Sequence, residues 1–344
     1  MVIQSWSATR SLADAFVLEC RRIGAQPLHV YEDEETYWAS TVTSRPSDLA
    51  RLGSHTRAAL EQADALVSFF GPSDRARHHA LDADVRHGLA EHQEAFLRAA
   101  ARSGCRAVSM AVGRASAASA QFYNVDLALW RTELLEGCLR DPAVLRRRAA
   151  RAMRLLSVGR SLRITHPNGT DLRLRLKHRF PQISDGFAGA RKDPRRWEIV
   201  TLPAGVVAVA VDESYAEGIF RSNVPSAAAL SGEVGDYAGG RWTFRGGRLT
   251  SFAYDRGGAA FEDSYRHGGP GRDRPGSLSI GLNDGLAVSP LLEDQGWGTV
   301  SFHIGRNDHV GGTNRATWWA WLFLRGANVT IDDRPVVQNG RLLP

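Results

Sequence analysis

Through residue 110, stretches with helical spacing of apolar positions alternate with short apolar runs. Residues 8–25 and 49–63 place apolar side chains three and four positions apart, which predicts amphipathic helices. The short apolar runs that predict buried strands are residues 26–31, 65–70 and 105–110. Such alternation is typical of a parallel sheet covered by helices. Residues 118–160 continue as mostly helical sequence.

The pattern changes near Gly159, where short segments of alternating apolar and polar residues begin. In the first of them, residues 162–176, the pair Asn168-Gly169 favours a tight hairpin turn. Further strands are predicted at residues 205–211, 218–220, 242–244, 249–253, 278–282, 299–304, 318–324 and 329–331. The sequence therefore predicts an α/β protein with two domains. Residues 1–158 form an α/β domain with a helix-covered parallel sheet, and residues 159–344 form a mixed or antiparallel β-rich domain.

Length and composition favour a folded cytoplasmic protein. The 344 residues exceed the usual size of a single core, which agrees with two domains. No apolar run approaches the ~20 residues that span a bilayer, and the first residues lack the features of a signal peptide. The three cysteines are far apart in sequence, which argues against a disulfide framework or a zinc site. We expect no membrane association.

The net charge of +6 changes this picture little. Lys177 and Lys192 are the only lysines, and a preference for Arg together with abundant Ala and Gly is what a GC-rich genome produces. The densest basic run, residues 145–154, follows a helical pattern and is interpreted as a solvated helix face. Charge alone therefore does not indicate a nucleic-acid partner, and none is expected.

The most specific motifs lie in the second half of the chain. They are Ile164-Thr-His-Pro-Asn-Gly-Thr-Asp-Leu172, Leu202-Pro-Ala-Gly-Val-Val207, Ser277-Leu-Ser-Ile-Gly-Leu-Asn283, the stretch from Gly298 to Asn314 with its Gly-Gly-Thr-Asn turn, and residues 331–340. In this order they resemble the aminopeptidase T (leucyl aminopeptidase) family. The same fold is used by the mononuclear-iron 2,5-dihydroxypyridine dioxygenases. The resemblance covers most of the chain and implies the two-domain fold of that family and a homodimer.

The departures from the family pattern concern the metal. The resemblance implies that Glu, Glu, His, His and Asp hold two metals in the peptidases. The corresponding positions here are Val206, Ser277, His303, Trp319 and Trp321, so only His303 is retained. A single imidazole binds a divalent ion weakly without carboxylates to offset the charge. We therefore expect no metal ligands, no cofactor and no active metallopeptidase.

Several polar residues remain candidates for a site. His303 is either a remnant of the family's metal site, now a hydrogen-bonded core histidine, or a functional residue that acts as general acid/base or contacts a substrate. Asp308 and His309 lie in the following turn and could join it, although a turn Asp more often bonds to its own backbone. The cluster of His78, His79 and His87 with Asp82 and Asp84 is interpreted as a solvated, exposed helix. Glu293 and Asp294 are interpreted as surface charge.

Trp318, Trp319 and Trp321 suggest a ligand. They can be plain core residues, but residues i and i+2 of a strand share a face, so Trp319 and Trp321 line the same surface. An aromatic wall without a metal binds an indole, another aromatic group or a peptide side chain.

These residues predict a metal-free protein that binds a peptide or amino-acid-like ligand. Its role would be that of an accessory or substrate-presenting protein in a specialised peptide-modification or natural-product pathway. The alternative is an enzyme that uses His303 as acid/base for hydrolysis, cyclisation or ring opening. A third alternative is a structural role, in which the protein stabilises a partner protein.

Overall fold

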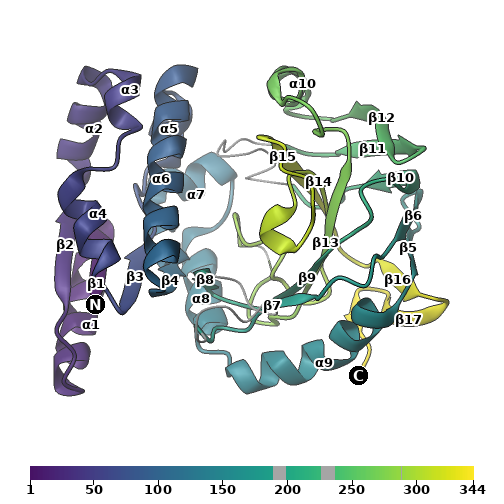
Figure 1. The fold of residues 1–344 in the computed structure, drawn as a ribbon, viewed down its shortest axis with the longest axis horizontal. Helices are drawn as coiled ribbons and strands as arrows, with labels where there is room; N and C mark the ends of the chain where they lie inside the picture. Colours follow the sequence, from purple (N-terminus) through teal and green to yellow (C-terminus); the bar gives the residue numbers. More distant parts are fainter. Residues whose placement is uncertain (189–198, 226–236, 288) are drawn as a thin grey trace. The chain divides into compact units, whose positions relative to one another are not determined.

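The computed structural model describes residues 1–188, 199–225, 237–287 and 289–344 (Figure 1). The chain divides into two compact units. The first contains Met1–Cys138 together with strand β8 (Ile199–Leu202), and the second contains Leu139–Asp185 together with Ala204–Pro344. Helix α9 (Pro142–Val158) belongs to the second unit, and the predicted domain boundary after residue 158 stays a prediction.

The first unit is built on a parallel sheet in the order β2-β1-β3-β4-β8. Its other strands are β1 (Val2–Trp6), β2 (Leu28–Glu32), β3 (Ala65–Phe69) and β4 (Arg106–Met110). The helical elements of this unit are η1 (Ser7–Thr9), α1 (Arg10–Arg22), α2 (Glu34–Thr43), α3 (Pro46–Leu49), α4 (Ser54–Glu61), α5 (Arg75–His79), α6 (Ala83–Ser103), η2 (Ala111–Arg114), α7 (Ala117–Tyr123) and α8 (Leu127–Cys138). The predicted parallel sheet with helices is confirmed.

Both faces of this sheet are covered, because successive strand residues point to opposite sides. Leu66 packs with Leu60 and Phe96, which come from α4 and α6. Its neighbour Val67 packs on the other face with Ile3 and with residues of α1. The near-continuous apolar runs of the strands follow from this double burial.

The second unit contains two antiparallel sheets. The larger has the order β12-β11-β10-β6-β5-β16-β17-β18, and the smaller, called sheet C here, has the order β15-β14-β13-β9-β7. Sheet C consists of β7 (Gln182–Ser184), β9 (Val206–Ala210), β13 (Pro275–Gly281), β14 (Val300–Gly305) and β15 (Trp319–Leu324). The larger sheet consists of β5 (Ser161–His166), β6 (Thr170–Arg175), β10 (Ala216–Arg221), β11 (Arg241–Arg245), β12 (Arg248–Ala253), β16 (Asn328–Ile331), β17 (Arg334–Gln338) and β18 (Arg341–Leu342). Helix α10 (Gly258–His267) and the turn η3 (Asp308–Val310) complete the unit, and the predicted antiparallel β-rich part is confirmed.

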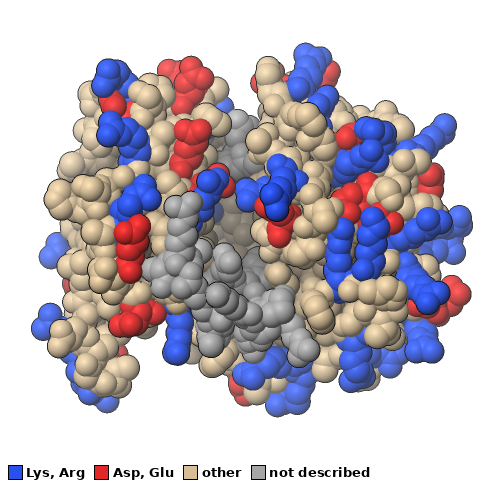
Figure 2. Space-filling model, viewed as in Figure 1, with Lys and Arg blue, Asp and Glu red and all other residues tan. Residues whose placement is uncertain are grey.

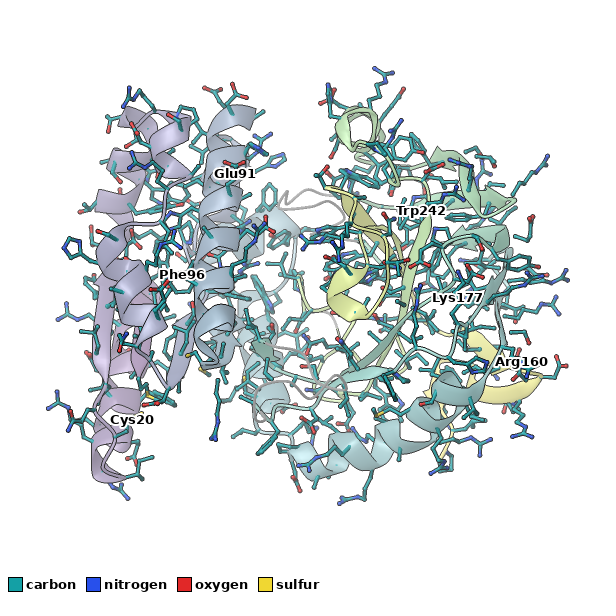
Figure 3. All side chains as sticks on the ribbon, viewed as in Figure 1. Cys20, Glu91, Phe96, Arg160, Lys177 and Trp242 are labelled. Carbon is teal, nitrogen blue, oxygen red and sulfur yellow. The ribbon has the colours of Figure 1, made fainter. Side chains whose placement is uncertain are left out.

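An aromatic core joins the two sheets of the second unit. Phe302 of β14 contacts the rings of Phe220, Trp242 and Phe244, at centroid distances of 5.7, 6.2 and 5.4 Å. All four side chains are buried, and Figure 3 labels Trp242. One face of sheet C is thus occupied by the aromatic core of this unit.

Two surface observations bear on partners. Figure 2 shows many Lys and Arg side chains over the second unit, with Asp and Glu side chains among them. In the described part of the chain, no helix combines the length and the apolar character needed to cross a bilayer. The absence of a nucleic-acid partner and the cytoplasmic location stay predictions.

Candidate functional site

One row of side chains crosses sheet C on the face away from the aromatic core. The strand register pairs Ser277 with His303, and His303 with Trp321. Directly paired residues of antiparallel strands project from the same face, so these three side chains are neighbours. Trp319 and Phe323 lie two residues to either side of Trp321 on that face. We call these five residues, together with Ser301, the polar face of sheet C.

Stacked rings form part of this face. The ring of Trp321 lies 4.8 Å from that of His303 and 4.7 Å from that of Trp319, measured between centroids. Phe323 follows at 5.7 Å from Trp321. The structure thus brings the rings of Trp319, Trp321 and His303 together, and their part in ligand binding stays a prediction.

Polar atoms on the same face lack hydrogen bonds. Ser277 Oγ, Ser301 Oγ, His303 Nε2 and Trp321 Nε1 are buried and have no partner within the described residues. A buried polar group without a partner costs about 1–3 kcal/mol, so native proteins contain few of them. Four together indicate a place where a ligand or ordered water completes the bonding.

His303 is uncharged at neutral pH. Its side chain is 5% exposed. Burial, and to a smaller extent the charge of His309, lowers the pKa of His303 to about 3. At pH 7 the neutral imidazole can form hydrogen bonds, but it accepts a proton weakly.

The turn between β14 and β15 holds this face in register. Asn307 is fully buried, and its Nδ2 donates to the Gly276 carbonyl (2.8 Å) and to Glu213 (3.0 Å). Its Oδ1 accepts from the backbone N–H of Asn314 (2.9 Å). A Cβ on Gly312 would lie 2.0 Å from Asn307 Oδ1, so only glycine fits there. The Gly-Gly-Thr-Asn motif therefore has a structural role.

Glu213 anchors the same turn from outside the motif. It accepts from both terminal nitrogens of Arg179 (2.7 Å each) and from the backbone N–H of Thr313 (2.9 Å). Burial alone would raise the pKa of Glu213, but these bonds and that from Asn307 lower it to about 2. The carboxylate stays ionised and fixes the turn.

Asp308 and His309 lie in η3, beside the polar face. Val310 of the same turn packs on Ala208 and Ala210 of β9, and Ala210 is paired with Ser277. Asp308 accepts from Arg306 Nε (2.7 Å). Burial lowers the pKa of His309. These two residues are therefore placed near His303, but Asp308 already has a cationic partner.

Comparison with known proteins gives the fold. No protein-family model and no curated protein matches the sequence. Wild-type AmpT (aminopeptidase T) from Thermus thermophilus is similar with a TM-score of 0.68 and 17% identity, covering 100% of this chain and 94% of that chain. The 2,5-dihydroxypyridine dioxygenase from Pseudomonas putida KT2440 is similar with a TM-score of 0.63 and 17% identity, covering 99% of this chain and 90% of that chain. The chain has the aminopeptidase T fold.

The residues at the family's ligand positions do not fit a metal. Ser277, His303 and Trp321 share one row, but Val206 pairs with Gly281, four residues along β13 and about 13 Å away at 3.3 Å per residue. The row offers a hydroxyl, an imidazole and an indole. No group of three or more His, Cys, Asp or Glu side chains suited to a metal occurs among the residues that the structure describes. The aminopeptidase T fold is thus present without that family's donor set.

Trp318 is placed apart from the other two tryptophans of its segment. It is 3% exposed, and its Nε1 donates to Ser264 Oγ of α10 (2.9 Å). Its ring contacts Phe261 and Tyr265 at 5.7 and 5.5 Å. These are contacts of a core residue, and its predicted part in ligand binding stays a prediction.

Two expectations about surface residues were wrong in part. Glu293 is 5% exposed, and burial raises the pKa of Asp294 to about 7. The backbone N–H groups of Leu282 and Asn283 donate to the Gln295 carbonyl, which holds this segment against the strand end. His78, expected on an exposed helix, is 8% exposed, whereas the His87 side chain is 77% exposed. The polar sequence around Glu293 and His78 did not indicate that segments distant in sequence bury these side chains.

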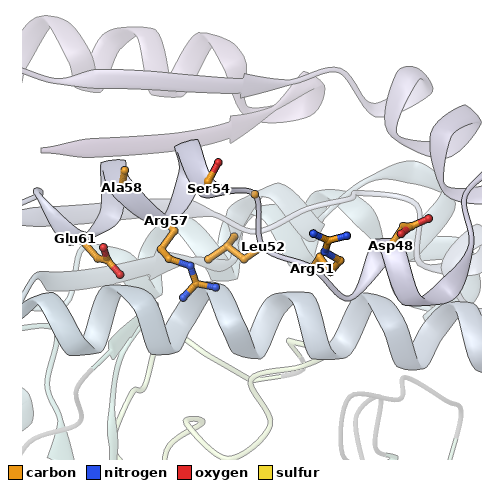
Figure 4. A pocket seen from close by; sticks show the side chains of 8 residues that line it. Asp48, Arg51, Leu52, Ser54, Arg57, Ala58 and Glu61 are labelled. Atoms are coloured by element: carbon orange, nitrogen blue, oxygen red, sulfur yellow. The ribbon is translucent and has the colours of Figure 1, made fainter.

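An open groove of about 510 Å³ lies in the first unit (Figure 4). It is lined by Asp48, Arg51, Leu52, Gly53, Ser54, Arg57, Ala58 and Glu61. Charges of both signs line it, and Asp48 already accepts from Arg45 Nε (2.8 Å). None of its residues belongs to the polar face of sheet C, and no motif of the sequence points to it.

Proposed function

We propose that this protein is a metal-free member of the aminopeptidase T fold that binds a peptide or amino-acid-like ligand on the polar face of sheet C. The observation that carries the proposal is the set of four buried polar atoms without partners beside two stacked indoles.

The chemistry of the face suits such a ligand. An indole N–H only donates, so Trp321 requires a ligand oxygen such as a peptide carbonyl or a carboxylate. The hydroxyls of Ser277 and Ser301 both donate and accept, which suits an amide group. An aromatic or apolar side chain of the ligand would pack on Trp319 and Trp321.

The proposed role is that of an accessory or substrate-presenting protein, acting as a homodimer in a specialised peptide-modification or natural-product pathway. Support comes from a retained fold with replaced metal-ligand positions. An enzyme that uses His303 as acid/base is less favoured, because burial lowers the pKa of His303 to about 3. A base with such a pKa is poorly matched to neutral pH.

Ligand binding is tested by isothermal titration calorimetry with a panel of dipeptides and free aromatic amino acids. Trp319→Ala and Trp321→Ala are expected to weaken binding at least about tenfold, since each removes an aromatic contact and Trp321 also loses a donor. Trp297→Ala is the matched control, because Trp297 contacts Arg148 instead (4.4 Å). Unchanged affinity in Trp321→Ala, or no binding by any panel member, would overturn the proposal.

Two further measurements separate the alternatives. Mass spectrometry of incubated peptides would favour the enzyme if His303→Ala abolishes turnover while affinity stays near wild type. Elemental analysis of the purified protein tests the metal-free part. Stoichiometric zinc, manganese or iron whose removal abolishes ligand binding would contradict it.

A further inference from the structure

Two arginines of the first unit follow the carboxyl ends of neighbouring strands. Strands β3 and β4 are paired in parallel, and Arg75 and Arg114 come from the segments that follow them, at the start of α5 and the end of η2. In α/β sheets, ligands bind outside the carboxyl ends of the strands. Both residues thus lie at the edge of the sheet where this fold class places ligands.

Neither guanidinium has an acidic partner among the residues that the structure describes. Arg75 is 5% exposed, and the Nε atoms of both Arg75 and Arg114 are buried without a hydrogen bond. No hydrogen bond or ion pair joins either guanidinium to a described residue. Arg114 instead lies over the ring of Phe70 at 4.2 Å. A buried cation without a partner is costly, and proteins rarely retain one without a reason.

The two charges are close enough to repel each other. Burial, and next the charge of Arg75, lowers the pKa of Arg114 to about 9. His78 lies on α5 with Arg75, and burial and the charges of Arg75 and Arg114 also lower the pKa of His78 to about 3. His78 Nδ1 is itself buried without a partner. Three nitrogen-bearing side chains are therefore near one another, and no described carboxylate forms an ion pair with any of them.

Two acidic side chains beside α5 are already engaged. Glu34 accepts from the backbone N–H groups of Ser73 (2.8 Å) and Asp74 (3.0 Å). Asp74 accepts from the backbone N–H of Arg77 (2.9 Å). Both carboxylates hold the main chain before and within α5 and form no ion pair with Arg75 or Arg114 within the described residues.

The backbone that carries Arg75 is fixed from a second side. Arg75 N–H donates to Ser119 Oγ (3.2 Å), and the hydroxyls of Ser116 and Ser119 both donate to the Ser73 carbonyl. Ser116 and Ser119 belong to the first turn of α7. Arg75 is thus presented by a rigid segment, which reduces the entropy lost when a ligand binds.

We infer that Arg75, Arg114 and His78 bind a phosphate-type dianion, either inorganic phosphate or the phosphoryl group of a small ligand. Two arginines offset the two negative charges of such a group, and their planar donors match its oxygens. His78 supplies a further nitrogen for a hydrogen bond.

The test is calorimetric titration of the full chain with inorganic phosphate in chloride buffer at constant ionic strength, with phenyl phosphate as the organic probe. Arg75→Met and Arg114→Met are each expected to weaken phosphate binding about 10- to 100-fold, because each removes a charge-assisted contact. Arg77→Met is the matched control. The Arg77 side chain lies on the same helix as Arg75, is 42% exposed and pairs with Glu35 (3.2 Å). The phosphate affinity of Arg77→Met should therefore stay within about twofold of that of wild type.

Thermal unfolding gives an independent readout. Without phosphate, Arg114→Met should melt no lower than wild type, because it removes the repulsion by Arg75. Addition of phosphate should raise the melting temperature of wild type and of Arg77→Met, but not that of Arg75→Met or Arg114→Met. Tighter binding of phenyl phosphate than of phosphate would identify a phosphorylated ligand, and the reverse would identify the free ion. The inference fails if phosphate does not stabilise wild type beyond chloride, or if it stabilises all variants equally.

Discussion

The two faces of sheet C differ although they alternate residue by residue along the same strands. Leu278, Phe302 and Leu322 form one row across β13, β14 and β15, and all three are fully buried. The adjacent row, one residue along each strand, is Ser277, His303 and Trp321, whose polar atoms lack partners. The first row stabilises the fold, whereas the second leaves buried polar atoms without partners at a cost in stability, where we propose that a ligand binds.

The comparison also explains why the turn at residues 306–314 is so heavily bonded. A shift of one residue in register would exchange the two faces and expose the aromatic core. Asn307, Glu213 and Gly312 fix the connection between β14 and β15 and so prevent this shift. In this part of the molecule, the Gly-Gly-Thr-Asn motif specifies geometry.

The largest expected effect is on the apolar face. Phe302→Ala should lower the free energy of unfolding by about 3–5 kcal/mol, because it removes a ring packed against three others. Urea denaturation followed by tryptophan fluorescence measures this loss. A cost no greater than that of Ser277→Ala would mean that the two faces do not differ as described.

A second effect concerns the anchor of the turn and depends on pH. The pKa of Glu213 is lowered from 4.5 to about 2, so its stabilisation is full above pH 4.5 and is lost as the pH falls through about 2. The loss over this window should be about 3 kcal/mol. Urea denaturation at several pH values measures it. Glu213→Gln should flatten the dependence, and a slope equal to that of wild type would contradict the assignment.

The smallest effect is expected on the polar face. Ser277→Ala should change the free energy of unfolding by less than about 1 kcal/mol, or raise it, because the hydroxyl has no partner to lose. Ser222→Ala is the matched control, since Ser222 Oγ donates to the Phe323 carbonyl (2.7 Å) and accepts from Val224 N–H (3.2 Å). Ser222→Ala should cost about 1–2 kcal/mol, and equal losses in the two variants would show that Ser277 is bonded.

Local patterns predicted the features that depend on neighbours in sequence. Helical spacing and apolar runs gave the parallel sheet, and the two-residue period of a strand placed Trp319 and Trp321 on one face. The motifs gave the aminopeptidase T fold. These three features depend on residue spacing within one element or on the order of short motifs, and both can be read from the sequence alone.

Features that depend on distant segments were missed. His78 lies in a polar stretch that was expected to be exposed, and it is buried where α7 packs beside α5. The bond from Trp318 to Ser264 of α10 could not be predicted, because the two residues are 54 positions apart in sequence. Strand β8 was not predicted, because a short strand between loops has no period long enough to recognise.

Strand β8 has a consequence for how the protein is made. It completes the sheet of the first unit beside β4, yet β5, β6 and β7 of the second unit precede it in the chain. On the ribosome, residues emerge in order at about 5–20 per second, so β4 remains an open edge until Leu202 has been synthesised. An open edge can pair with another nascent chain. A gene divided after codon 138 or codon 158 would therefore encode a first half with an incomplete sheet, and the two units are expected to mature as one translation product.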